Sequence, residues 1–133
     1  MLLALAEQQG IRSDVIPTIA TGFCGGISRT GNLCGAVSGG VMGLGLAFGR
    51  HTPQDSREPA YTAVQAFLAR FEARFGSLTC PGLTGCHLGT PEGMEKFHQI
   101  RDTIDCAGFV SEGARMVWEL IQAGTDKDTD ETN

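Results

Sequence analysis

The sequence lacks several features that would assign it to a common functional class. Its 10 lysine and arginine residues are outnumbered by 15 aspartate and glutamate residues, which gives a net charge of −5. Nucleic-acid-binding proteins need a basic face, so no nucleic-acid partner is expected. No glycine-rich nucleotide-binding motif is present. There is no C-x-x-C, so the sequence contains neither a thioredoxin-type redox pair nor a zinc knuckle.

Signals for secretion or membrane insertion are also missing. The apolar start, Met1–Ala6, contains no basic n-region, and its apolar run is too short for the h-region of a signal peptide. The uncharged run Thr30–Gly49 has the length of a membrane span, but seven of its twenty residues are glycine, so membrane insertion is not expected. We predict a cytoplasmic protein, and there five cysteines are more typical of reactive or metal-binding sites than of a disulfide framework.

No segment alternates apolar and polar residues for long enough to predict a strand. The 133 residues correspond to one domain. The sequence therefore predicts an all-α fold, an irregular bundle of five or six helices around a glycine-rich central helix. The domain is expected to cover residues 1–123. An acidic tail with a charge of −3 over residues 124–133 is expected to be disordered.

Glycine is the abundant residue. Ten of the 19 glycines lie in residues 22–49, and both glycine and apolar residues recur there at helical spacing. The pattern predicts a buried helix over Asn32–Phe48, with Asn32 or Thr30 as its N-cap. Five glycines inside a helix cost about 5 kcal/mol of helix propensity. We therefore expect close backbone packing, with Gly35, Gly39 and Gly43 against another helix.

Capping signals mark the ends of the other helices. Gly10 ends a first helix, and Gly76 ends an apolar-striped helix that starts at about Pro59. Threonine followed by proline at position 91 starts a helix that runs to about Ile104. Asp105 is the predicted N-cap of the last helix.

The cysteines are the candidate reactive residues. Cys34 and Cys106 each follow a predicted N-cap, where unpaired N–H groups and the helix dipole favour a thiolate. Cys80 and Cys86 lie in the glycine-rich segment Ser77–Gly89, predicted to be a loop or a single short turn. Unpaired cysteines are often simply small buried side chains, and position alone leaves both interpretations open.

Four segments together carry a resemblance to a known family. They are GFCGGISRTGNLCGAVSGGVMGLGLAFG, FGSLTC, LTGCHLGTPEG and DCAGFVSEGA. They resemble the proteins named C_GCAxxG_C_C after their cysteine pattern, for which a redox role is proposed. Residues Cys34–Gly39 match the CGAxxG core, and Cys80 and Cys106 fall on later family cysteines. The resemblance implies a small helical redox protein without an assigned substrate.

The sequence departs from that pattern in two places. The family commonly has a further cysteine upstream, in an Asn-Cys-Ala stretch of its first helix. Here the chain opens at Met1 inside what resembles the end of that helix, so we expect a missing upstream segment. Cys24 stands where relatives tend to have glycine. Its role is open, and we expect it to be more peripheral than the other cysteines, with Cys86 nearer the site.

Two main functional hypotheses follow, and the sequence does not decide whether the protein is an enzyme. In the first, a thiol oxidoreductase, the cysteines 34, 80 and 106 converge and a pair cycles between dithiol and disulfide, with an unidentified redox partner. In the second, Cys34, Cys80, Cys86 and Cys106, with or without His87, hold zinc or an iron–sulfur cluster. A third interpretation is that the cysteines only pack.

Apolar faces predict a homodimer. The helix after Pro59 carries Phe67, Leu68, Phe71 and Phe75, and the last helix carries Met116, Trp118 and Leu120. Large exposed apolar patches are uncommon on monomers. Two-fold dimers are the commonest way to cover them.

Overall fold

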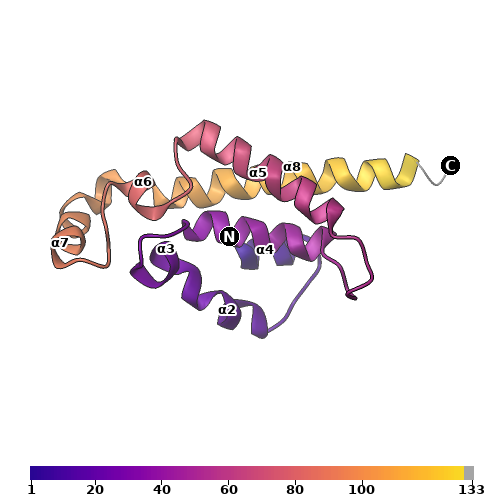
Figure 1. Cartoon of the computed structure of the whole chain (residues 1–133), viewed down its shortest axis with the longest axis horizontal. Helices are drawn as coiled ribbons and strands as arrows, with labels where there is room; N and C mark the ends of the chain where they lie inside the picture. The colour runs from indigo at the N-terminus through magenta and orange to yellow at the C-terminus, as the bar shows by residue number, and fades with distance from the viewer. Residues whose placement is uncertain (131–133) are drawn as a thin grey trace.

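The computed structural model describes the backbone of residues 1–130 and the side chains of residues 1–126. Within this part the chain is helical and has no strand, which confirms the predicted all-α class. In order, the elements are α1 (Leu2–Gln8), α2 (Val15–Ala20), η1 (Thr21–Phe23), α3 (Cys24–Arg29), α4 (Gly35–Phe48), α5 (Glu58–Phe75), α6 (Cys80–Thr84), α7 (Pro91–Ile100), η2 (Arg101–Thr103) and α8 (Cys106–Asp130) (Figure 1).

Helix α4 packs against α1, α5 and α8. In Figure 1 the long helices α5 and α8 cross on one side of α4, while α2 and α3 lie on the other. Helices α6 and α7 lie at the end of the molecule opposite to the C-terminal end of α8. The elements that carry Cys34, Cys80 and Cys106 are therefore gathered towards the same end of α4.

The uncharged run of residues 30–49 divides between two structures. Residues 32–34 pair with residues 78–80, and α4 begins only at Gly35, with Cys34 as its N-cap. The prediction that Asn32 or Thr30 caps this helix was therefore wrong, because the pairing takes up the backbone groups of residues 32 and 34. No helix among the described residues is long and apolar enough to cross a membrane.

The glycines of α4 lie where neighbouring groups come close. A Cβ at Gly40 would lie 2.5 Å from the ring of Phe67 on α5. A Cβ at Gly43 would clash with Leu5 on α1, and one at Gly39 would lie 2.8 Å from Met1. Real Cβ atoms essentially never approach other atoms so closely. Glycine therefore lets α1 and α5 pack closely on α4, which offsets its poor helix propensity.

The core lies between α4, α5 and α8. Its fully buried side chains include Val37 and Leu44 of α4, Phe67 and Phe71 of α5, and Val117 of α8. The Phe67 and Phe71 rings meet edge-on with centroids 5.9 Å apart, a favourable geometry for aromatic pairs. This cluster joins the three helices into one packed unit.

The apolar faces that motivated the homodimer prediction point into this core. Phe67, Phe71 and Met116 are buried, and the remaining apolar residues of those two faces are half-buried against the same cluster. The most exposed of the large hydrophobic side chains are instead Val15 and Ile19 on α2. The homodimer stays a prediction, without the surface first expected to form it.

Four of the helix ends lie at caps that the sequence predicts. Gly10 and Gly76 have the positive φ values (72° and 83°) of glycine caps. The Thr90 side chain accepts a hydrogen bond from the N–H of Gly93 (3.0 Å), and Asp105 Oδ1 accepts one from the N–H of Gly108 (2.8 Å). These four caps are confirmed. Helix α7, however, ends at residue 100 and not at 104, because the 3₁₀ turn η2 follows it.

Helix α8 continues through Asp130, beyond the boundary that the sequence predicts for the acidic tail. Gly124 does not end the helix. Its missing side chain instead leaves room for the ring of Phe48 on α4. A Cβ at that position would lie 2.6 Å from the Phe48 ring. Extending an existing helix costs little per residue compared with starting one. The last three residues of the predicted tail, 131–133, lie outside the described residues.

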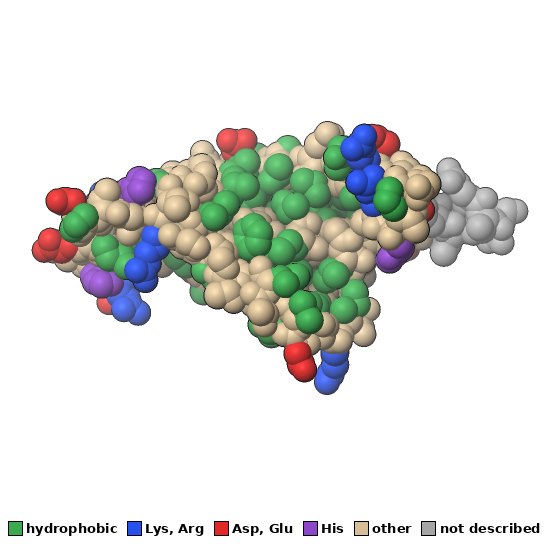
Figure 2. Space-filling view, turned by 60° about the horizontal axis from the view of Figure 1, so that its bottom comes forward, with side chains coloured by type: hydrophobic (Ala, Val, Ile, Leu, Met, Phe, Trp, Pro, Cys, Tyr) green, Lys and Arg blue, Asp and Glu red, His purple; other side chains and the backbone are tan. Residues whose placement is uncertain are grey.

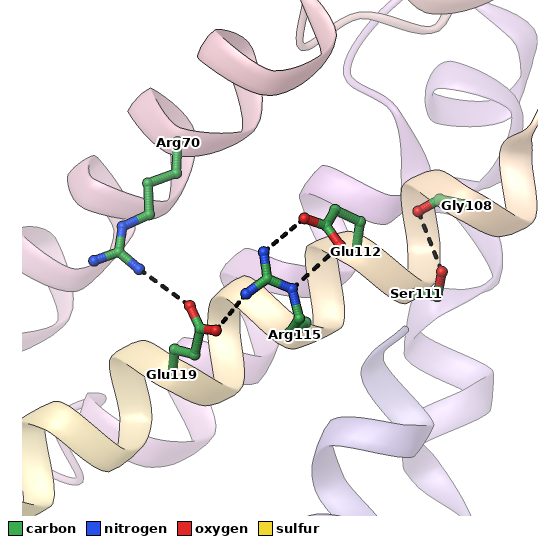
Figure 3. Close-up of polar contacts among 6 residues, drawn as sticks. All are labelled: Arg70, Gly108, Ser111, Glu112, Arg115 and Glu119. Carbon is green, nitrogen blue, oxygen red and sulfur yellow. Dashed lines mark hydrogen bonds and ion pairs between the residues drawn. The ribbon is translucent and has the colours of Figure 1, made fainter.

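An exposed ion-pair network connects α5 to α8 (Figure 3). Arg70 of α5 lies 3.7 Å from the carboxylate of Glu119 on α8. Arg115 donates to Glu119 and, at 2.6 Å, to Glu112. Exposed pairs of this kind contribute little stability, so the network supplements the aromatic core that joins the two helices.

Candidate functional site

An isolated antiparallel bridge between Leu33 and Thr79 places two cysteines side by side. The N–H of Cys34 donates to the carbonyl of Leu78, and the N–H of Cys80 donates to the carbonyl of Asn32, both at 2.9 Å. Side chains alternate between the two faces of a β ladder. Cys34 and Cys80 are therefore diagonal neighbours on one face, a relation that separates Cα atoms by about 7–8 Å in a regular ladder.

Both cysteines lie at the point where the bridge turns into a helix. Cys34 is the N-cap of α4. Cys80 is the first residue of α6, whose N-cap Thr79 accepts a hydrogen bond from the N–H of Gly82 at 3.1 Å. The sequence predicts a helix start for Cys34 but only a loop or short turn for Cys80. The structure places Cys34, Cys80 and Cys106 alike at the start of a helix.

The segment labelled α3 is a left-handed turn that packs against this pair. All residues from Gly25 to Arg29 have φ between 52° and 71°. For a non-glycine residue this region costs about 1–2 kcal/mol, and such conformations persist only where surrounding contacts hold them. Here the N–H of Asn32 donates to the carbonyl of Gly26 (2.9 Å), and Ser28 Oγ donates to that of Gly22 (2.9 Å).

Glycine lets this turn reach the cysteines. A Cβ at Gly26 would lie 2.5 Å from Cys80 Cβ, so the backbone of the turn rests directly on Cys80. A Cβ at Gly35 would lie 3.6 Å from the Cα of Cys24. The first turn of α4 therefore contacts the backbone at the start of α3. The turn thus lies against both Cys80 and the first turn of α4.

Four cysteines line one cavity of about 380 Å³: Cys24, Cys34, Cys80 and Cys106. The rest of the lining is mainly apolar and includes three phenylalanines, at positions 23, 97 and 109. On the face seen in Figure 2, hydrophobic side chains gather over the middle while charged side chains lie at the margins. The cavity is therefore a small apolar pocket whose reactive groups are thiols.

The five cysteines differ in exposure, and all are free thiols. Cys80 is buried, Cys34 is half-buried, and Cys24 and Cys106 are exposed at the cavity. Contrary to the expected order, Cys24 lines the cavity and Cys86 does not, although Cys86 lies near enough to Cys80 for its charge to raise the pKa of Cys80, as predicted. Cys86 is fully buried outside the cavity lining, where its Sγ donates to the carbonyl of Thr84 at 3.6 Å.

The predicted metal ligands are not gathered into one set. Among the described residues, no group of three or more histidine, cysteine, aspartate or glutamate side chains is placed to hold one metal ion. His87 is also outside the cavity lining. Its Nδ1 accepts a hydrogen bond from the N–H of Gly89 at 3.2 Å. The metal interpretation stays a prediction that metal analysis can test.

Comparison with known families matches most of the chain to one of them. A family model described as "Putative redox-active protein (C_GCAxxG_C_C)" matches residues 1–120. The chain belongs to the C_GCAxxG_C_C family. The matched region contains all five cysteines and extends from α1 into α8. No curated protein and no solved structure gives a significant match.

The CGAxxG core of this C_GCAxxG_C_C member has a structural explanation. Cys34 opens α4, Gly35 lies against the backbone of Phe23 and Cys24, and Gly39 lies against Met1. The two glycines thus let separate segments reach the helix that carries the cysteine. Cys24 was the site residue that sequence reasoning missed. The Gly25-Gly26 pair after it was the available signal, because paired glycines permit a left-handed turn.

Desolvation at the cavity disfavours thiolates at two of the site cysteines. Burial raises the pKa of the Cys80 thiol, a hydrogen bond from Thr84 opposes the shift, and negative charge on Cys34, Cys106 or Cys86 adds to it. Cys106 is exposed, but the groups around the cavity partly desolvate its thiol, which raises its pKa, and charge on Cys34 and Asp105 adds to that effect. The direction of this pKa shift is opposite to the thiolate predicted at the start of the last helix.

This arrangement predicts a pH profile for Cys106. A raised pKa keeps the thiol protonated to higher pH, so the midpoint of its alkylation rate should lie above that of the same cysteine in urea-unfolded protein. Cys34→Ser should lower the midpoint, because it removes a neighbouring negative charge. Iodoacetamide labelling from pH 7 to 11, followed by mass spectrometry of the tryptic peptide 102–115, measures both. A native midpoint at or below the unfolded one would contradict this prediction.

Proposed function

We propose that this protein is a thiol-based redox protein in which Cys34 and Cys80 cycle between a dithiol and a disulfide, with Cys106 as the third thiol of the site. The observation that carries the proposal is the Leu33–Thr79 bridge, which sets the two cysteines on one face as diagonal neighbours. A disulfide needs Cα atoms within about 7 Å. The diagonal Cα spacing of a regular ladder, about 7–8 Å, lies at or just beyond that limit, so a small backbone movement at the bridge completes the bond.

The difference in burial assigns a role to each member of the pair. Cys34 is half-buried and lines the cavity, so an incoming molecule can reach its sulfur. Cys80 is buried and its pKa is raised, so it suits the second, internal step. Cys106 faces the same cavity, and its titration depends on the charge of Cys34. All three predicted cysteines are thus included in the proposed site.

The reaction is a two-step thiol–disulfide exchange with an external disulfide as the oxidant. The Cys34 thiolate attacks one sulfur of the external disulfide and expels the other sulfur as a thiolate. Cys80 then loses its proton and attacks Cys34 Sγ, which breaks the mixed disulfide and releases the second thiol. Two electrons and two protons pass from the cysteine pair to the oxidant. The apolar cavity of about 380 Å³ is of a size that accepts a small organic disulfide.

Disulfide mapping tests the proposal. Fully reduced protein is treated with excess oxidised glutathione or cystamine, quenched in acid, alkylated and digested with trypsin. Trypsin separates Cys34 (peptide 30–50) from Cys80 (peptide 75–96). The expected product has lost two titratable thiols and links these two peptides. Cys34→Ser and Cys80→Ser should each abolish that link.

Cys86→Ala is the matched control, because Cys86 shares the peptide of Cys80 but lies outside the cavity lining. This variant should retain the Cys34–Cys80 link. Because Cys80 is then the one cysteine in peptide 75–96, the link is assigned to it directly. Wild-type protein that forms no such link would overturn the proposal. A stoichiometric metal in anaerobically purified protein, with the site thiols as ligands, would favour the metal-binding alternative instead.

A further inference from the structure

Cys24 connects the thiol cavity to the outside. A second hollow, of about 490 Å³, adjoins the first and shares Cys24, Gly25, Leu88 and Phe97 with it. The second hollow has a more polar lining, which includes Thr21, Ser28 and Arg29. Cys24 is exposed and is the one cysteine among the described residues that lines both hollows. A molecule that approaches through the outer hollow meets Cys24 before the other thiols.

The backbone of Cys24 is also close to that of Cys34. A Cβ at Gly35 would lie 3.6 Å from the Cα of Cys24. Since a Cα–Cβ bond adds about 1.5 Å, the Cα atoms of Cys24 and Gly35 lie within about 5 Å of each other. Cys34 is the residue directly before Gly35. The Cα atoms of Cys24 and Cys34 therefore lie within about 9 Å of each other, since consecutive Cα atoms are about 3.8 Å apart, and Cys24 is on a different element from Cys80.

We propose that Cys24 is the outer exchange thiol of the site and carries the oxidised state from the buried pair to the surface. This inference rests on the proposed Cys34–Cys80 disulfide. Cys24 loses its proton and attacks Cys34 Sγ, which breaks the Cys34–Cys80 bond, forms a Cys24–Cys34 bond and returns a proton to Cys80. The exchange conserves electrons and protons and needs no external oxidant or reductant.

Exposure explains why the step is useful. In the Cys34–Cys80 disulfide one sulfur belongs to a buried residue and the other to a half-buried one. A cavity of about 380 Å³ has the size of a small-molecule pocket, so a thiol carried by another protein is too large to enter it. After the exchange the disulfide includes exposed Cys24, which a bulky partner can attack from the outer hollow. A small disulfide in the cavity would then oxidise the protein, and a larger thiol at the outer hollow would reduce it again.

The first test traps the exchanged state. Cys80→Ser protein is oxidised with cystamine and mapped as above, and Cys24 and Cys34 fall on separate tryptic peptides, 13–29 and 30–50. We expect a Cys24–Cys34 link in this variant. A link between Cys34 and Cys106, or a persistent mixed disulfide on Cys34 with cystamine, would overturn the assignment of Cys24. The wild-type Cys34–Cys80 link tests the proposed function separately, so the two failures are distinguishable.

The second test measures the outward transfer. Oxidised wild-type and Cys24→Ala proteins are reduced either by dithiothreitol or by a dithiol fixed on beads, which cannot enter the cavity. Cys24→Ala should slow reduction by the beads at least about tenfold and leave the dithiothreitol rate within about twofold. Equal bead rates for the two proteins would overturn the proposal. Cys86→Ala, which alters a thiol outside the cavity lining, should behave as the wild type in both arms.

Discussion

Gly40→Ala is expected to destabilise the protein by about 1–3 kcal/mol, the cost of overpacking a well-packed core. The new Cβ would lie 2.5 Å from the ring of Phe67 and 3.2 Å from Val117. Both side chains are fully buried, so the contact can be relieved only if α5 or α8 moves away from α4. Urea unfolding of reduced protein, followed by circular dichroism, measures the change in unfolding free energy. Gly40→Leu should be more destabilising still.

Gly45→Ala is the matched control, because it makes the same substitution in the same helix. No atom lies within 4 Å of a Cβ placed there. Alanine should therefore stabilise α4 by up to about 1 kcal/mol through its higher helix propensity. If the unfolding free energy falls in Gly40→Ala and rises in Gly45→Ala, the effect of core packing is distinguished from that of helix propensity. A Gly40→Ala protein that gains as much stability as Gly45→Ala would contradict a packing role of Gly40.

Gly26→Ala is expected to damage both stability and the site. The residue has φ 71°, and its Cβ would lie 2.5 Å from Cys80 Cβ and 3.0 Å from the carbonyl of Asn32. Conformational strain of about 1–2 kcal/mol adds to the cost of overpacking. We expect a loss of about 2–4 kcal/mol. Because the clash pushes Cys80 away from the turn, the yield of the Cys34–Cys80 link should also fall.

Gly25→Ala separates strain from contact. Its φ of 67° is similar, but its Cβ would meet Arg29 and Leu88 at ordinary distances of 3.5 and 3.8 Å. It should therefore cost only the strain of about 1–2 kcal/mol and preserve the link. Unfolding in urea and the mapped yield of the disulfide are measured on both variants. Equal disulfide yields would argue against a role of Gly26 in positioning Cys80.

Local signals explain why much of the fold was predictable from sequence. The glycines at 10 and 76, Thr90 and Asp105 act within one helical turn, so their neighbours in the chain suffice to identify them as caps. The all-α class follows from helical periodicity in the same way. The C_GCAxxG_C_C resemblance also selected Cys34, Cys80 and Cys106, which the structure places on one cavity.

The geometry of the site depends on contacts between residues far apart in the chain. The sequence predicts a helical residue at 33, but pairing with Thr79 delays the start of α4 and makes Cys34 a neighbour of Cys80. The left-handed turn includes Ile27 and Arg29, residue types that rarely adopt positive φ on their own. The turn is held by its packing on Cys80 and on α4, together with the hydrogen bonds that Asn32 and Ser28 donate to Gly26 and Gly22.

The sequence by itself therefore determined the all-α class, the caps at Gly10, Gly76, Thr90 and Asp105, and the set of thiols that resembles a redox family, because these depend on local chemistry and composition. The tertiary structure decided which thiols share a cavity, brought in Cys24 and left out Cys86. It also reversed the expected shift of the Cys106 pKa. The helix start favours a thiolate there, but partial desolvation and the charges of Cys34 and Asp105 raise the pKa. These outcomes depend on which segments pack together, and spacing along the chain does not specify that.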